Sequence, residues 1–231
     1  MQTRAIIDLV DWDCDLRTFF RERNSGGAGL GVSAALNWFF ESVEEGIILE
    51  YDCVPDPDFF LYCRELLSRY RDNARIMFIS GNNFQDGNKR GDSSYFFSPL
   101  THNWGWATWR SVWKRYEFDL RKIRKALFYS ALSQYNKDKE IIRYWKMIFM
   151  MMRMGRIDTW DYQLMFSIWM NNGLAIVPNV NLVTHLVLEN GESGTFFTSH
   201  MEGITNIQTH PIMPLRHPRE IRQNEEAYQY H

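Results

Sequence analysis

The sequence is poor in the features that define several common classes of protein. Its three cysteines are odd in number and lack the paired spacing of a zinc knuckle, so neither a disulfide framework nor a structural zinc site is expected. Lysine and arginine number 26 against 28 aspartates and glutamates, so no basic excess indicates nucleic acid as the main ligand. A phosphate-bearing ligand would have to be held locally, by a metal ion, a helix end or a single arginine.

The chain also has little that would hold it in a membrane. Its most apolar run, residues 147–152, is short and is bounded by Lys146 and Arg153, whereas a spanning helix needs about 20 mostly apolar residues. No continuous apolar segment follows the first residues, so a signal peptide is not predicted either. We therefore expect a cytoplasmic protein with at most peripheral membrane association.

Aromatic side chains, in contrast, are abundant at 16% of the 231 residues. Hydrophobic residues make up 45% and charged residues 23%, which is a globular composition at a length that suits one α/β domain. Aromatic residues are ordinary core material, and half-buried ones also stack on flat, hydroxyl-rich ligands such as sugars. The composition leaves both roles open.

Hydrophobic periodicity predicts alternating helices and strands. The expected order is a helix at 32–45, an apolar strand at 47–49, a helix capped by Asp58 and ending near Tyr70, and a strand at 75–80. This order predicts a right-handed crossover and a doubly wound, mostly parallel sheet. Further helices are expected at 119–128, 138–154 and 161–172. Residues 1–206 are expected to form the domain, and 207–231, with three prolines, a loosely ordered tail.

The chemistry is predicted to lie at Glu50-Tyr51-Asp52, directly after the apolar strand. Ligands in open α/β sheets bind beyond the carboxyl ends of the strands. Two carboxylates at positions i and i+2 there can meet Mn²⁺ or Mg²⁺ and the phosphates that the ion bridges. From spacing alone, two solvated loop carboxylates are an equally simple interpretation.

Several blocks of sequence resemble one enzyme family. GIILEYDCVPDPDFFLYC at 46–63 is similar to the Glu-Asp-Asp strand and following helix of GT-A glycosyltransferases. The likeness extends to bacterial hemolysin-like (HlpA-like) nucleotide-diphospho-sugar transferases and, more distantly, to N-acetylglucosaminyltransferase I. The other blocks occur in the family's order: RERNSGG at 21–27, SGNN at 80–83, SSYFFS at 93–98, WGWATWR at 104–110 and TWDYQ at 159–163.

The resemblance implies a GT-A, Rossmann-like fold with a helical C-terminal part and transfer of a sugar, with inversion, from a UDP- or GDP-sugar to a glycan or lipid-linked acceptor. It implies Asp52 as the direct metal ligand and Asp161 as the general base. The residues that it implies as substrate contacts are Arg21, Asn24, Glu50, Tyr51, Gly81, Trp104, Gly105 and Trp106.

These residues also have simpler interpretations. Asp161 precedes an apolar helix and could be its N-cap. Arg21 and Asn24 precede a glycine-rich turn that leads into a helix, which suits phosphate binding but is a common arrangement. Trp104 and Trp106 could be core residues, and His185 is expected to be structural.

The sequence departs from the family in three places. Tyr51 stands where the family usually has Asp, which removes a carboxylate that would hold metal-bound water. A family histidine after the last strand falls near Gly194, and the family's first strand is missing ahead of residues 4–10. These departures favour an alternative, an inactive GT-A pseudoenzyme or fragment that binds a glycan or a protein.

Overall fold

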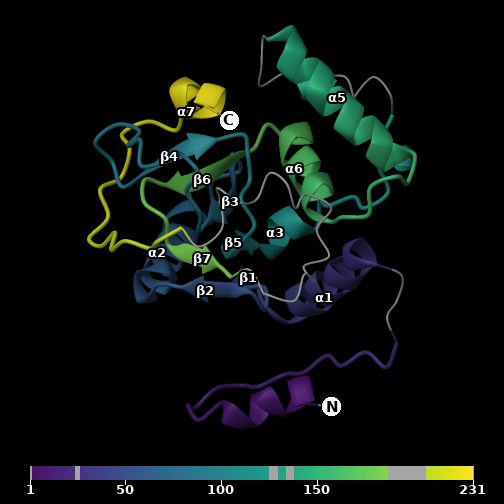
Figure 1. The fold of residues 1–231 in the computed structure, drawn as a ribbon, viewed down its shortest axis with the longest axis vertical. Helices are drawn as coiled ribbons and strands as arrows, with labels where there is room; N and C mark the ends of the chain where they lie inside the picture. The colour runs from purple at the N-terminus through teal and green to yellow at the C-terminus, as the bar shows by residue number, and fades with distance from the viewer. Residues whose placement is uncertain (1, 24–26, 125–129, 134–137, 187–206, 231) are drawn as a thin grey trace.

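The computed structural model describes residues 2–23, 27–124, 130–133, 138–186 and 207–230. They form a mixed α/β fold with a five-stranded sheet in the order β1-β5-β3-β6-β4 and a separate two-stranded sheet, β2-β7 (Figure 1). The strands are β1 (Glu45–Ile48), β2 (Cys53–Pro55), β3 (Ile76–Ser80), β4 (Tyr95–Ser98), β5 (Trp106–Trp109), β6 (Leu174–Pro178) and β7 (Val183–His185). The helices are α1 (Ala28–Ser42), α2 (Pro57–Tyr70), α3 (Arg110–Trp113), α5 (Lys139–Arg153), α6 (Asp161–Met170) and α7 (Glu225–Tyr230), with 3-10 helices η1 (Gln2–Leu9) and η2 (Leu120–Lys122).

The sheet is less parallel than the sequence predicts. In the five-stranded sheet, as far as the structure describes the chain, β3 and β6 pair in parallel, whereas β1 with β5, β3 with β5, and β4 with β6 pair antiparallel. Strands β1 and β3 do run in the same direction, but β5 lies between them, and β1 is an edge strand rather than a central one. The sequence pattern predicts no strand at the positions of β4 and β5. Each is a four-residue run buried on both faces, which leaves no alternating pattern to detect.

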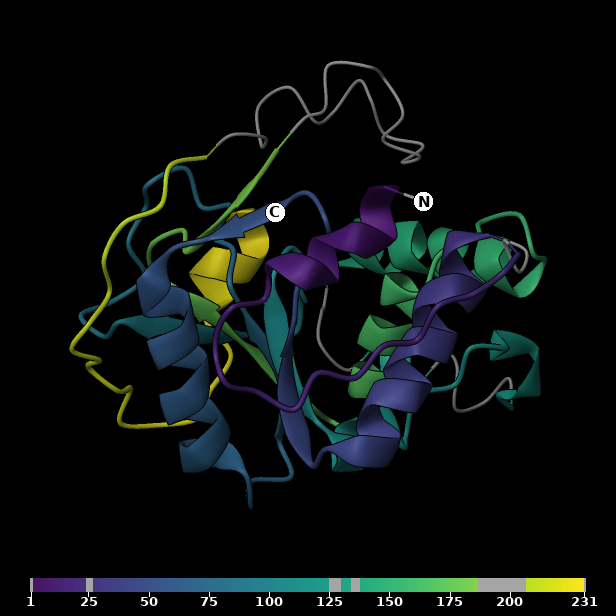
Figure 2. The same cartoon turned by 90° about the horizontal axis from the view of Figure 1, so that it is seen from below.

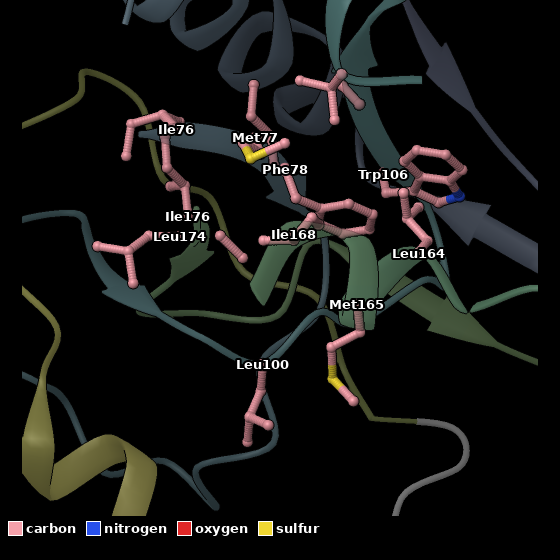
Figure 3. Close-up of a cluster of buried hydrophobic side chains, with 14 of the residues drawn as sticks. Ile76, Met77, Phe78, Leu100, Trp106, Leu164, Met165, Ile168, Leu174 and Ile176 are labelled. Atoms are coloured by element: carbon pink, nitrogen blue, oxygen red, sulfur yellow. The ribbon is translucent and has the colours of Figure 1, made fainter. Parts of the chain in front are cut away.

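The main core lies between the sheet and α6. Phe78 of β3 stacks on Trp106 of β5, with ring centroids 4.9 Å apart, and both are almost fully buried. Leu164, Met165 and Ile168 of α6 come to this face of the sheet (Figure 3). Trp160, just before α6, stacks on Trp106 at 5.4 Å. This packing fixes the start of α6 relative to the ends of β3 and β5.

Helix boundaries agree with the sequence in some places and differ in others. The helix predicted at 32–45 begins earlier, at Ala28, with Gly27 as its N-cap. The predicted helices at 138–154 and 161–172 appear as α5 and α6. The helix predicted at 119–128 appears only as the short η2, and residues 125–128 lie outside the described part of the chain. No helix among the described residues is long and apolar enough to cross a membrane.

The N-terminal segment lies across α1 (Figure 2). Phe19 stacks on Trp38 of α1 with ring centroids 5.5 Å apart. Arg4 donates a hydrogen bond to the carbonyl of Arg21 at 2.8 Å, and its guanidinium lies over the ring of Phe20. These contacts hold Phe19 against α1 and Arg4 against residues 20–21.

Helix α2 is capped by Asp56, not by Asp58. The Asp56 carboxylate accepts from the backbone N–H of Asp58 at 2.9 Å. The Asp58 carboxylate instead accepts from the backbone N–H groups of Ile212 and Met213, at 2.9 and 3.1 Å. The sequence predicts a loose tail from residue 207, whereas residues 207–230 of the structure run along the body of the protein and end in α7 (Figure 1). The composition of residues 207–231 gives no sign of these contacts, because the groups that bond to Asp58 are backbone N–H groups.

We expect Asp58→Ala to loosen the segment around 210–216, because two backbone donors lose a charged acceptor. The predicted loss of unfolding free energy is about 1–3 kcal/mol. Hydrogen exchange measured by mass spectrometry should show reduced protection in this segment. Asp72→Ala, at an exposed position after α2, is the matched control. Unchanged protection at 210–216 in Asp58→Ala would contradict the prediction.

Candidate functional site

The site begins where β1 ends and the chain turns into β2. Strand β2 pairs antiparallel with β7, with Cys53 opposite His185. The backbone N–H of Leu186 donates to the carbonyl of Asp52 at 2.8 Å. Because these contacts are made by the main chain, Asp52 is held beside His185 although the two residues are far apart in sequence.

The side chains of Asp52 and His185 meet directly. His185 Nε2 lies 3.1 Å from Asp52 Oδ2, and both residues are only 7% exposed. The indole of Trp104 stacks on the imidazole, with ring centroids 4.1 Å apart, and Phe84 packs edge-on against Trp104. His185 Nδ1 is buried without a hydrogen-bond partner in the described structure. The histidine interpreted from sequence as structural therefore contacts the residue predicted to bind metal.

Glu50 lies within electrostatic reach of both other carboxylates. Burial raises the pKa of Glu50 to about 7, and the negative charges of Asp52 and Asp161 add to the effect. Among the described residues, none of these three acids forms an ion pair with a lysine or arginine. Acidic groups from the end of β1 and the start of α6 thus lie within electrostatic reach of Glu50, and among the described residues the basic side chain that contacts one of them is His185, at Asp52.

Asp161 stands at the first position of α6. Its carboxylate accepts a hydrogen bond from the Thr159 hydroxyl and from backbone N–H groups at residues 161 and 162. Burial raises the pKa of Asp161, while these three donors act in the opposite direction. The N-cap of α6 is Trp160, and no side chain caps this helix, so Asp161 is not the N-cap that its position in the sequence also suggested. Its role as a base stays a prediction.

The glycine-rich turn lies against the segment that carries Asp161. A side chain at Gly29, in the first turn of α1, would meet the carbonyl of Thr159 and the carboxylate of Asp158, each at 2.6 Å. Arg21 lies beside this turn, close to Gly31. The segments around residues 21–31 and 158–161 are thus neighbours in space. Asn24 lies outside the described residues.

Three of the predicted substrate contacts are buried. Trp106 is completely buried between Phe78 and Trp160. Gly81 and Gly105 are covered by Val183, which would lie 2.7 Å from a side-chain atom at either position. In the structure these residues support the site rather than line an open surface. Trp104, the residue before Gly105, remains partly exposed.

Tyr51 points to solvent, with 78% of its surface exposed. The structure thus separates the triplet, because Asp52 is buried, Glu50 is half-buried and Tyr51 is outside. Two surface hollows, of about 450 and 710 Å³, lie near Arg71 and near Arg90, and neither is lined by the triplet. Neither hollow therefore coincides with the site predicted at Glu50-Tyr51-Asp52.

The residues present can be tested against a divalent ion. Among the described residues, no group of three or more His, Cys, Asp or Glu side chains is arranged to hold a metal. Mg²⁺ and Mn²⁺ in nucleotide sites, however, need only one or two protein ligands, because phosphates and water supply the rest. The Asp52 carboxylate, beside further acids without basic partners, fits such an ion.

The chain was also compared with known proteins. No family model matches it, and no curated protein matches it significantly.

Glu50 generates a prediction about pH. Because its pKa is higher in the fold than its ordinary value of 4.5, the stability linked to Glu50 is full below pH 4.5 and is lost as pH rises through about 7. We expect Glu50→Gln to be more stable than the wild type at pH 8 by on the order of 1–3 kcal/mol, and nearly equal at pH 4.5. Urea denaturation in metal-free buffer measures both. Glu41→Gln, exposed on α1, is the control and should show the same pH dependence of stability as the wild type. If Glu50→Gln also showed the wild-type pH dependence, the raised pKa would not belong to Glu50.

Proposed function

We propose that this protein is a GT-A-type glycosyltransferase that transfers a sugar from a nucleotide-diphosphate sugar to an acceptor hydroxyl. The observation that carries the proposal is the gathering of Glu50, Asp52 and Asp161 without a lysine or arginine partner among the described residues. Carboxylates from distant segments, placed beyond the end of a strand, are what a metal-bound diphosphate and a general base require. The mixed sheet, flanked by helices, is compatible with a GT-A fold.

Each residue has a role in this proposal. Asp161 accepts the proton of the acceptor hydroxyl as that oxygen attacks C1 of the sugar, and its raised pKa favours taking up a proton. Asp52 holds the cation, which would neutralise charge on the diphosphate leaving group. Trp104 offers an aromatic face near the donor sugar. Arg21, beside the first turn of α1, offers its guanidinium to phosphate oxygens.

A second function is favoured by other observations at the same residues. The Asp52 carboxylate is already engaged by His185, Tyr51 is exposed where a carboxylate would assist the metal, and the Asp161 carboxylate is occupied by the Thr159 hydroxyl and by backbone N–H groups. A GT-A-like protein without catalysis, which binds a glycan or a partner protein, has these properties. Isothermal titration of UDP and GDP, with and without MnCl₂, separates the two: metal-dependent nucleotide binding supports the enzyme, and its absence supports the binding module.

The base is tested by Asp161→Asn. The change removes proton acceptance and preserves shape, so we expect transfer to fall by at least 100-fold while nucleotide affinity changes by less than about 3-fold. Release of nucleotide from UDP- and GDP-sugars, followed with an acceptor panel, is the measurement. Asp138→Asn, at the N-cap of α5, is the control, because asparagine caps helices as well as aspartate does. Continued turnover by Asp161→Asn places the base elsewhere.

The exposed tyrosine allows a gain-of-function test. We expect Tyr51→Asp to strengthen Mn²⁺-dependent nucleotide binding about 10-fold, because it adds a carboxylate that can hold metal-bound water. Tyr51→Asn removes the ring without adding charge and should bind as the wild type does. Titration calorimetry of both variants decides the point. Equal affinities for the aspartate and asparagine variants would show that no cation lies near this position.

A further inference from the structure

Apolar side chains are exposed along the N-terminal segment, residues 4–20. Six of the large hydrophobic side chains that the described structure leaves exposed belong to this segment: Ile6, Leu9, Trp12, Leu16, Phe19 and Phe20. Leu9 is 74% exposed and Trp12 is 65% exposed. Exposed apolar side chains that follow one another along a surface mark an interaction site. The N-terminal segment therefore has the character of a docking surface.

The charge of the segment restricts the kind of partner that it fits. Its acidic residues are Asp8, Asp11, Asp13 and Asp15, and its basic residues are Arg4 and Arg17. Arg17 pairs with Asp15, and Arg4 donates to the carbonyl of Arg21. The net negative charge disfavours a membrane of anionic lipids. A surface that is both apolar and basic is the complementary partner.

The outer face of α5 has this chemistry. Tyr144, Met147 and Met154 are exposed there, and their spacing of three and seven residues places them in one stripe along the helix. We call these three residues the α5 stripe. Three exposed cations lie beside it, whereas the helix has one acidic residue: the cations are Lys139, Arg143 and Lys146, and the acid is Glu140. Methionine side chains adapt readily to the shape of a partner.

The two surfaces also agree in spacing. Acidic and apolar residues alternate from Asp11 to Leu16, and all six are exposed. In an extended segment, alternate side chains lie on the same side, about 6.7 Å apart, and helix positions i and i+4 lie about 6 Å apart along the axis. A row of aspartates in the segment can therefore follow the row of cations on α5, while the apolar residues between them cover the α5 stripe.

We propose that the protein forms a dimer in which residues 9–16 of each copy lie along the α5 stripe of the other. Within one molecule, η1 and α5 lie at opposite ends (Figure 1), so the segment does not meet its own α5. Each copy carries both surfaces, and two copies that exchange segments cover both of them in a closed pair. The dimer does not depend on the proposed transfer reaction, because neither surface includes a residue assigned to it.

Sedimentation velocity of the full chain over a concentration series tests the dimer. We expect Trp12→Ser and Met147→Ser each to raise the dimer dissociation constant at least 10-fold, because each removes an apolar side chain from the contact. Leu61→Ser is the matched control, since Leu61 is exposed on α2, and it should change the constant by less than about 2-fold. Thermal unfolding by circular dichroism checks that each variant folds.

An exchange of charges tests which two surfaces meet. One double variant carries Asp11→Lys and Asp13→Lys, and the other carries Lys139→Glu and Lys146→Glu. Each variant alone brings like charges together, so we expect its dimer to be at least 10-fold weaker than that of the wild type. In an equimolar mixture both contacts join opposite charges again, and the heterodimer should regain wild-type affinity within about 3-fold. A mixture that stays as weak as the separate variants would overturn the proposal.

Cross-linking distinguishes exchange between copies from contacts within one copy. A carbodiimide joins carboxylates to lysine amines, and an equimolar mixture of unlabelled and ¹⁵N-labelled chains should give peptides from residues 8–15 and α5 that combine both isotopes. Cross-links confined to one isotope would place the contact within a single copy and overturn the proposal. So would a chain that stays monomeric at every concentration. Binding of phosphatidylcholine vesicles by such a monomer, lost in Trp12→Ser, would identify a lipid surface as the partner instead.

Discussion

The close approach of β7 to the ends of β3 and β5 is the constraint on which the site depends. Val183 packs against Gly81 and Gly105 so tightly that a side-chain atom at either glycine would lie 2.7 Å from it. Gly105 also has a φ of 75°, a conformation that favours glycine. Any larger residue would push β7 outward and carry His185 away from Asp52. Gly81 and Gly105, which the resemblance implies as substrate contacts, thus act on the site through packing, because they allow β7, the strand that bears His185, to approach closely.

The second constraint is electrostatic. Burying carboxylates near one another disfavours their charged forms. Burial, together with the charges of Asp52 and Asp161, therefore raises the pKa of Glu50 to about 7. A fold optimised for stability alone would place a lysine or arginine among such groups, as Arg71 pairs with Glu45 on the surface nearby. Among the described residues none serves Glu50, Asp52 or Asp161. Acidic groups kept close at a cost to stability are typical of functional sites.

The sequence predicts local features of this protein better than its pairings. Strand β3 and helices α5 and α6 follow from apolar runs and periodicity, and the acids after β1 follow from their position beyond a strand. The antiparallel β5, the pairing of β2 with β7 and the contact of Asp52 with His185 join segments far apart in the chain, where no local pattern specifies the partner. Asp58 illustrates the same limit. A carboxylate at the start of a helix predicts a cap, but the sequence does not show that the Asp58 carboxylate accepts instead from the backbone N–H groups of Ile212 and Met213.

Asp161 shows why a carboxylate that is bonded within its own segment can still be compatible with the predicted role of a base. A carboxylate with three hydrogen-bond donors is a weakened base, because the donors stabilise its charged form. For Asp161, burial nevertheless outweighs the Thr159 hydroxyl and the backbone N–H groups, so its pKa is raised rather than lowered. These bonds fix the direction of the carboxylate, and Trp160 fixes the helix start by stacking on Trp106. A buried, oriented carboxylate with a raised pKa combines the affinity for a proton and the fixed position that a general base needs, so the hydrogen bonds of Asp161 are compatible with the predicted chemistry.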